Sequence, residues 1–378
     1  MRVLMLLALV GCGSAENTPA DDDSTPEAAS VLPTVIVIVI VIVIVDGETG
    51  DPGLKSAQAL TFAPAGHLVV GDGVRDRLVV LATDDTTWDA NAAAFARVRN
   101  LYAAAADALG VDSGDVEIRD IAVNPLSGRT YVAVDRLDRD AGAVLTVTPD
   151  GALAALDLSA ATYAVVPYEE RDGEGSVVTD LVWASDTVVA AVTEQAWTSS
   201  QVVTFSTPVS HRDAAAVATT DTYHRVHGQW ETFAPITTLF AYTDAQDLGW
   251  VGASYQCAPV VRFEVADLAA GGEVTGVTPY DYGGGRQVLD FAVMGDGEAA
   301  DIYASVLNLG GTRVDAELFF ADGKVDEDAP VAFDFGGAPD HAKASNAKRL
   351  DDAERIAALG TDQLVVWTGS ALDIVDRP

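Results

Sequence analysis

The stretch Asp120–Val134, with the sequence DIAVNPLSGRTYVAV, decides the fold. It places a short apolar segment after an aspartate, then a turn with proline and glycine, then a second segment rich in β-branched residues. Such segments, separated by Asn, Pro, Ser and Gly, are typical of two β-strands joined by a turn. We therefore expect an antiparallel hairpin here.

The same unit recurs along the chain. Its copies begin at Ala59, Asp120, Asp180, Thr238, Asp290 and Arg355. The third segment is expected at Ala316–Phe320 in the fifth copy and at Leu372–Val375 in the sixth. The starts lie about 52 to 65 residues apart, and such regular β-rich units are typical of radial or solenoid repeats. The pattern predicts an all-β fold, a β-propeller over residues 50–378 with six blades, or seven if one long connection contains a degenerate blade.

The longest interruption runs from Trp88 to Leu109. It is rich in alanine and has larger apolar residues at helical spacing, among them Phe95, Val98 and Leu101. This spacing predicts one amphipathic helix near 88–109, packed on the propeller.

The N-terminus has the features of an export signal. Arg2 precedes the apolar run Val3–Val10, which is too short to span a bilayer. The run ends in Gly11-Cys12 and resembles the lipobox of bacterial lipoproteins, although an ordinary signal peptide with a chance cysteine is the alternative. The resemblance implies a signal peptide over 1–11, lipidation of Cys12 and a membrane anchor. Gly13 after the cysteine then favours the outer membrane, on its periplasmic or surface face.

Two segments connect this signal to the repeats. Residues 12–34 are rich in Ala, Asp, Ser, Thr and Pro, which predicts a disordered tether. Residues 35–45 alternate Val and Ile without a polar residue and are expected to form a strand. Because the sixth copy has only three segments, we expect part of this run to pair with Leu372–Val375 and close the ring. A tandem expansion with no structural role is the alternative.

Charge and cysteine content limit the classes of partner. The net charge of −35 disfavours nucleic acid and anionic lipid surfaces as partners. Either an acidic surface suited to salt or a set of divalent-cation sites explains the excess of carboxylates. After Cys12 only Cys257 remains, so no internal disulfide is expected, and Cys257 is interpreted as a small buried apolar residue.

The segment Asp120–Val132 resembles secreted bacterial β-propeller proteins related to NHL and YVTN repeat proteins. The resemblance extends through Thr179–Leu181, His224–Ile236 and Tyr255–Phe263, and covers about residues 57 to 310. It implies the propeller fold and supplies no reaction.

The first residue of each inner strand is expected near one mouth of the central channel. Asp120, Asp180, Asp290 and Arg355 are therefore candidates for an axial site. The three carboxylates could hold Ca²⁺, as similar sites do in gluconolactonase-like propellers, which would suit a metal-dependent hydrolase or lactonase. The alternative is structural: each aspartate could pair with Arg355 or with backbone amides of the next blade.

A second candidate site is a ligand loop with His224, His227, Glu231 and Tyr255. Histidines and a glutamate three and four residues apart could bind a metal if they shared a helical face. Pro235 and the strand pattern indicate instead a loop that enters a blade, where these residues need not converge.

Motifs for several reactions are absent from the sequence. It contains no Cys-x-x-Cys-His haem attachment, no Gly-x-Ser-x-Gly nucleophile turn and no phosphate-binding glycine loop. We therefore expect a membrane-tethered binding or scaffold protein for a protein, peptide or glycan ligand, with the calcium-dependent hydrolase as the alternative.

Overall fold

The computed structural model describes residues 43–168, 175–194, 201–224, 229–231, 234–243, 249–256, 259–282, 286–295, 300–315 and 345–378. All of them belong to one compact unit, Val43–Pro378. Within these ranges no helix is long and apolar enough to cross a membrane.

The described residues form six antiparallel sheets, which we number as blades 1 to 6 in chain order. From the inside outward, blade 1 is β3 (Leu60–Ala63), β4 (His67–Asp72), β5 (Arg77–Ala82), β10 (Ala161–Pro167) and β2 (Glu48–Gly50). Blade 2 is β6 (Val116–Val123), β7 (Thr130–Arg136), β8 (Ala141–Val147) and β9 (Leu153–Ala155). Blade 3 is β11 (Ser176–Ala184), β12 (Thr187–Glu194), β13 (Gln201–Ser206), β15 (Ala216–His224) and β16 (Gln229–Glu231).

The other three blades have four, four and three strands. Blade 4 is β17 (Ile236–Thr243), β18 (Gly249–Tyr255), β19 (Pro259–Glu264) and β21 (Val277–Asp281). Blade 5 is β22 (Val288–Met294), β23 (Asp301–Val306), β24 (Gly310–Asp315) and β25 (Ser345–Asn346). Blade 6 is β26 (Arg355–Leu359), β27 (Gln363–Trp367) and β28 (Leu372–Asp376).

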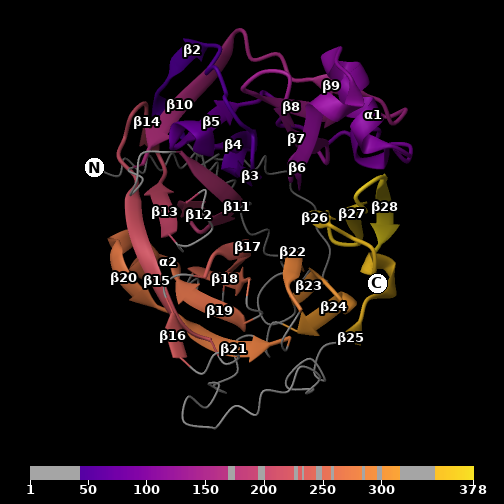
Figure 1. Cartoon of the computed structure of the whole chain (residues 1–378). Helices are drawn as coiled ribbons and strands as arrows, with labels where there is room; N and C mark the ends of the chain where they lie inside the picture. The colour runs from indigo at the N-terminus through magenta and orange to yellow at the C-terminus, as the bar shows by residue number, and fades with distance from the viewer. Residues whose placement is uncertain are drawn as a thin grey trace, which may run out of the picture. The chain divides into compact units, whose positions relative to one another are not determined.

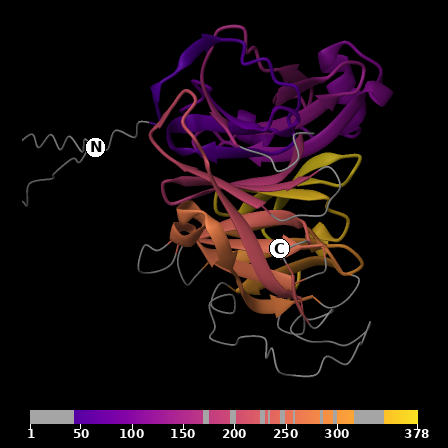
Figure 2. The ribbon, with the colours of Figure 1, turned by 60° about the vertical axis from the view of Figure 1, so that its left-hand side comes forward.

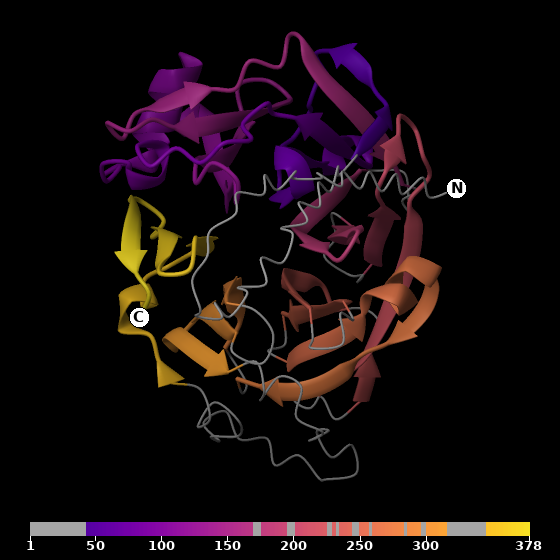
Figure 3. The ribbon, with the colours of Figure 1, turned by 180° about the vertical axis from the view of Figure 1, so that it is seen from behind.

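The inner strands contact one another in a closed ring. β3 contacts β6 and β11, β11 contacts β17, β17 contacts β22, β22 contacts β26, and β26 contacts β6. The fold is therefore a six-bladed β-propeller, as the repeats predict (Figure 1). Around the ring the blades follow in the order 1, 3, 4, 5, 6, 2, which Figure 3 shows from behind.

Blade 2 is an excursion from blade 1, which explains this order. The chain leaves blade 1 after β5, builds blade 2, and returns as β10 to pair antiparallel with β5. The return strand aligns Tyr163 with Leu81 and Val165 with Val79. The sequence repeats indicate six units but not this order, because the pairing joins segments about 80 residues apart.

The blades are held together by apolar clusters between neighbours. Six larger clusters each join two adjacent blades; Val69 and Leu181, for example, share the cluster between blades 1 and 3. The middle strands are consequently buried on both faces, which is why β7 reads as a nearly continuous apolar run. Burial of apolar area, about 25 cal/mol per Å², is the main stabilising contribution.

The ring closes between blades 6 and 2. Val98 and Leu372 exchange two backbone hydrogen bonds, each of 2.9 Å, and the Leu101 N–H donates to the Ser370 carbonyl at 2.7 Å. The rings of Tyr102 and Trp367 lie 6.4 Å apart beside these bonds.

The Val/Ile run was expected to make this closure. Its described end forms β1 (Ile44–Asp46), which pairs in parallel with β14 (Val209–Ser210) next to blade 3. Val43 is buried there. Residues 35–42 lie outside the described residues, so their pairing with Leu372–Val375 stays a prediction. The closing bonds seen at Leu372 come from Val98.

Two other expectations need correction. The inserted helix α1 (Leu101–Leu109) is shorter than predicted, because Asn100 caps its N-terminus by accepting from the Ala103 N–H at 3.1 Å. Residues 88–100 are irregular apart from a 3₁₀ turn at Ala92–Ala94. The third strand of blade 5 is β24, ahead of the expected Ala316–Phe320, which lies outside the described residues.

One long strand joins two blades at the periphery. β15 pairs with β13 of blade 3 and, in parallel, with β20 (Gly272–Thr275), which follows the helix α2 (Val265–Ala270) of blade 4 (Figure 2). This pairing covers an edge that would otherwise be open.

Candidate functional site

Four inner strands contain a β-bulge at the same place. The pairing register shifts between Ile118 and Asp120, Val178 and Asp180, Ile236 and Thr238, and Val288 and Asp290. The residues that the pairing skips are Arg119, Thr179, Thr237 and Leu289. A bulge bends its strand and re-aims side chains. Here it separates the polar side chains of two consecutive residues at the channel.

The residue after the skipped position forms one level of the channel. In ring order this level reads Ala59, Asp180, Thr238, Asp290, Arg355, Asp120. Aspartate therefore alternates with a residue that is not acidic, so no two carboxylates lie on adjacent blades. Because the repulsion between two charges falls with their separation, this alternation limits the unfavourable electrostatic energy among the three carboxylates. The structure thus brings together the candidate axial residues, and all three aspartates line one cavity.

Each aspartate binds the backbone of the next blade. Oδ2 accepts from Leu60 N–H for Asp120, from Leu239 N–H for Asp180 and from Ile356 N–H for Asp290, each at 2.7 Å. Oδ1 accepts from the following residue in its own strand, Ile121, Leu181 or Phe291, at 2.7 to 2.8 Å. Hydrogen bonds to a charged acceptor contribute about 1.5 to 3 kcal/mol each. The aspartates therefore link blades 2 and 1, 3 and 4, and 5 and 6.

Other polar groups link the remaining neighbours. Thr238 Oγ1 lies 2.7 Å from Asp180 Oδ2 and 3.2 Å from Asp290 Oδ1, which joins blade 4 to blade 5. Arg355 Nε lies 3.8 Å from Asp120 Oδ1, between blades 6 and 2. Gln58 Oε1 accepts from the Val178 N–H at 2.9 Å, between blades 1 and 3. Every junction of the ring thus has a polar contact at the channel.

Burial changes the protonation of these groups. It raises the pKa of Asp290 to about 7, with a further increase from Asp180 and an opposing effect of Arg355. Burial and the charge of Asp180 raise the pKa of Asp120 well above its usual value, and burial raises the pKa of Asp180. Burial opposes the charge of Arg355, but the three carboxylates raise its pKa overall. Burial therefore makes these carboxyl groups harder to ionise than exposed aspartates, Asp290 among them.

The geometry does not fit a calcium ion. A Ca²⁺ site needs six to eight oxygen ligands that converge on one point. Here each carboxylate oxygen already accepts an N–H, and Arg355 lies beside them. Among the residues that the structure describes, no three His, Cys, Asp or Glu side chains are grouped for a metal ion. The hydrogen bonds observed are those of the structural alternative.

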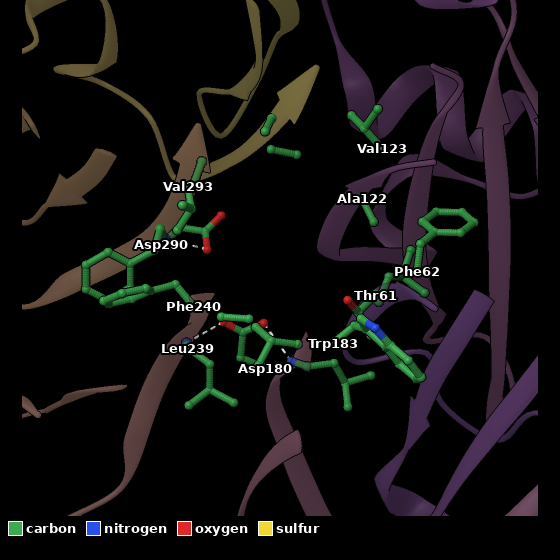
Figure 4. Close-up of a pocket in the computed structure, with 18 of the residues that line it drawn as sticks. Thr61, Phe62, Ala122, Val123, Asp180, Trp183, Leu239, Phe240, Asp290 and Val293 are labelled. Atoms are coloured by element: carbon green, nitrogen blue, oxygen red, sulfur yellow. Dashed lines mark hydrogen bonds between the residues drawn. The ribbon is translucent and has the colours of Figure 1, made fainter. Parts of the chain in front are cut away.

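The cavity beyond the aspartates has mainly apolar walls. It has a volume of about 350 Å³, and Figure 4 shows Asp180 and Asp290 among the residues that line it. Its walls include Phe62, Val123, Trp183, Phe240, Val293 and Ala358. We call this end of the channel the apolar mouth. An apolar pocket with a few convergent polar groups is typical of a ligand site.

An exposed tryptophan lies on the same side of blade 2. The ring of Trp88, which is 52% exposed, lies over Gly128, where an added Cβ would come within 2.9 Å of it. Gly128 belongs to the β6–β7 turn, whose Pro125 lines the apolar mouth. Asp85 fixes this turn by accepting from Ser127 Oγ at 2.7 Å. Trp88 therefore lies beside the mouth.

Charged, amide and hydroxyl side chains are among the residues at the opposite end of the channel. A second cavity, of about 230 Å³, is lined by Gln58, Arg119, Thr179, Thr237, Gln287 and Arg355 together with Val177, Val178, Val288 and Leu289. We call it the polar mouth. The sequence analysis missed all of its polar residues except Arg355. The available signal was the polar residue directly before the repeat start in four copies, at 58, 119, 179 and 237.

The structure describes part of the predicted ligand loop. β15 and β16 form a hairpin that pairs His224 with Gln229 and Thr222 with Glu231, so the two candidates lie on opposite strands rather than on a helix. Tyr255 is buried in blade 4, where its hydroxyl donates to Thr220 Oγ1 at 2.8 Å. His227, Cys257 and Cys12 lie outside the described residues.

No protein-family model and no curated protein matches the chain. Among solved structures it is similar to Raptor from Chaetomium thermophilum, at 9% identity and a TM-score of 0.36, over 88% of this chain and 29% of that chain. It is also similar to PorZ, a surface component of the type-IX secretion system of Porphyromonas gingivalis, at 9% identity and a TM-score of 0.34, over 88% and 39%. A chain of a mitotic checkpoint complex matches at 10% identity and a TM-score of 0.37, over 96% and 99%. The chain spans less than half of Raptor and PorZ, and likenesses of this strength carry no argument about function.

Proposed function

We propose that this propeller is a binding or scaffold protein, exported and anchored to the membrane through Cys12, that holds its ligand at the apolar mouth. Of a protein, a peptide and a glycan, the apolar mouth favours a protein or peptide. The observation that carries the proposal is the cavity of about 350 Å³ with aromatic and aliphatic walls at one end of the channel.

The walls and the floor of the mouth suit an inserted side chain. Trp183 is partly exposed and offers apolar area, which contributes to binding when water is excluded from it, while the buried Phe62 and Phe240 lie in the same wall. Asp180 at the floor can accept one more hydrogen bond through Oδ1, which among the described residues accepts only from the Leu181 N–H, because a carboxyl oxygen has two lone pairs. An apolar side chain with a donor at its tip matches both features.

Trp88 extends the same surface outside the cavity. Leu126, in the β6–β7 turn, is 37% exposed close to Pro125. Exposed tryptophan held rigidly is frequent where proteins bind one another, since ordering it costs little entropy. The rim of the mouth thus offers a partner a surface beyond the inserted side chain.

Photo-crosslinking from defined positions tests this placement. Trp88 or Trp183 is replaced by a photoreactive phenylalanine analogue in cells, and Leu137 or Val74 serves as the control position. Leu137 and Val74 are 58% and 47% exposed and lie outside the lining of the apolar mouth. A discrete crosslinked species is expected from the first pair only. Equal yields from both pairs would contradict binding at the apolar mouth.

The anchor has its own test. Cys12→Ser removes the thiol that lipidation requires, so the variant is expected in the soluble fraction after cell breakage while the parent protein sediments with membranes. Metabolic labelling with an alkyne fatty acid gives a second readout, which the variant should lose. A variant that still sediments and is still labelled would rule out lipidation at Cys12.

A further inference from the structure

We propose that the polar mouth is a second binding site, for a single neutral sugar ring or a similar polyol. It goes beyond the proposed function, because it concerns the opposite end of the channel and a different ligand class.

The first argument is unused donor capacity. Arg119 donates through Nε to Asp135 at 2.8 Å and contacts Glu117 through Nη1 at 2.9 Å. Arg355 donates through Nη1 to the Leu289 and Glu354 carbonyls. Within the described part of the chain, Nη2 of either arginine makes no hydrogen bond. These groups are therefore available to a ligand with acceptor oxygens.

Two glutamines add amide groups to the same cavity. Gln58 uses its Oε1 for the Val178 N–H, and its Nε2 donates to no described residue. The amide of Gln287 makes no side-chain hydrogen bond with a described residue, and the Gln287 carbonyl accepts from the Leu307 N–H at 2.8 Å. An amide both donates and accepts, which matches a hydroxyl group, itself a donor and an acceptor.

Both arginines of the mouth already lie against acidic side chains, which favours a neutral ligand. Asp135 and Glu117 lie against Arg119, and Asp120 lies against Arg355. The whole chain has a net charge of −35, which repels anions further. A carboxylate or phosphate would therefore gain little here, whereas a neutral hydroxyl can use the same N–H groups.

The shape and the walls set the size of the ligand. A cavity of about 230 Å³ is smaller than the range typical of drug-sized ligands, about 300 to 1,000 Å³, so it suits one ring. Val177 on blade 3 and Leu289 on blade 5 offer apolar area to the cavity, and the buried Val178 and Val288 lie behind them. A sugar ring has apolar C–H faces and a polar edge, so it can use both kinds of wall.

The bulges explain why these side chains face the channel. Arg119, Thr179 and Thr237 occupy the skipped positions on blades 2, 3 and 4. Bulges are frequent beside functional sites because they re-aim a side chain. Three successive copies of the repeat therefore present a polar residue at the same level.

The test uses the full chain in a detergent without a sugar head group. The neutral probes are the methyl glycosides of glucose, galactose and mannose, with N-acetylglucosamine. The charged probes are glucuronate and citrate. Saturation-transfer NMR and titration calorimetry are expected to detect at least one neutral probe and to give a weaker response for both charged ones. The proposal would be overturned if no neutral probe bound detectably at 10 mM, or if a charged probe bound more tightly than the neutral ones.

Variants locate the site. Gln287→Leu removes an amide that the fold does not use, and should weaken binding about 2- to 10-fold, as the loss of one neutral hydrogen bond does. Val177→Phe fills the cavity and should reduce binding further. Ala358→Trp fills the apolar mouth and should leave sugar binding unchanged. If Ala358→Trp abolishes binding and the first two variants do not, the sugar binds at the apolar mouth and this proposal is wrong.

Discussion

At the residue scale, the three channel aspartates combine a structural role with an unusual protonation. Asp290 links blades 5 and 6 through the Ile356 N–H, while Thr238 lies 3.2 Å from its other oxygen. A protonated carboxyl can still accept these bonds and can donate one. Burial among like charges therefore favours the neutral acid in the folded protein.

Stability should consequently depend on pH at Asp290. Its pKa is about 7 in the folded protein and close to 3.8 when the chain unfolds. The folded state then holds the proton between these values, so stability falls as pH rises from about 4 to about 7 and is flat above. The largest possible change is roughly 4 kcal/mol, at 1.36 kcal/mol per pKa unit.

Urea unfolding at pH 5 and pH 8 measures this dependence. Asp290→Asn cannot ionise, so its free energy of unfolding should change less between the two pH values than that of the parent. Asp373→Asn, at a half-exposed site, is the control and should behave like the parent. An unchanged pH dependence in Asp290→Asn would show that Asp290 is ionised in both states.

At the element scale, the sequence predicted the inner strands and missed what depends on distant contacts. The six repeat starts lie within or directly before the inner strands, because local apolar pattern and turn residues determine those strands. Other features depend on distant pairing. β10 returns to blade 1 only because β5 is free to pair with it, and Val98 meets Leu372 only once the ring has formed.

The candidate sites follow the same division. Alignment of the repeats predicted that Asp120, Asp180, Asp290 and Arg355 lie at one level of the channel. It did not show whether their oxygens were free, since that depends on amides of the adjacent blades, such as Leu239 N–H. The sequence analysis did not predict Gln287, because it has no equivalent position in the other repeats. It lines the polar mouth because the chain passes this mouth just before β22.

Ring closure gives an element-scale prediction. Val98→Pro removes the N–H that donates to the Leu372 carbonyl and disturbs the reciprocal bond. We expect a loss of about 3 kcal/mol or more in the free energy of unfolding, a cost typical of proline where an N–H is used. Thermal unfolding followed by circular dichroism measures it. The control is Arg97→Ala, whose side chain is 60% exposed, and an equal stability of both variants would show that Val98 does not close the ring.

At the scale of the whole molecule, the channel has a cavity at each end, and different residues line the two. The first residues of the inner strands and the segments before them line the polar mouth, and the later residues line the apolar mouth. The aspartate level separates the two. One ring can therefore hold two ligands of different chemistry, and a variant at one end can be tested without altering the other.

The most direct test of the central claim compares crosslinking through an open and a filled apolar mouth. The photoreactive residue replaces Trp88 on the rim beside blade 2, and Ala358→Trp fills the cavity from the neighbouring blade 6. The proposal predicts a discrete crosslinked partner from the protein with Ala358. The crosslinking yield should fall strongly in Ala358→Trp and should be restored in Ala358→Gly, which leaves the cavity open. An unchanged yield in the filled variant, with the protein still folded, would contradict the claim that the apolar mouth holds the ligand.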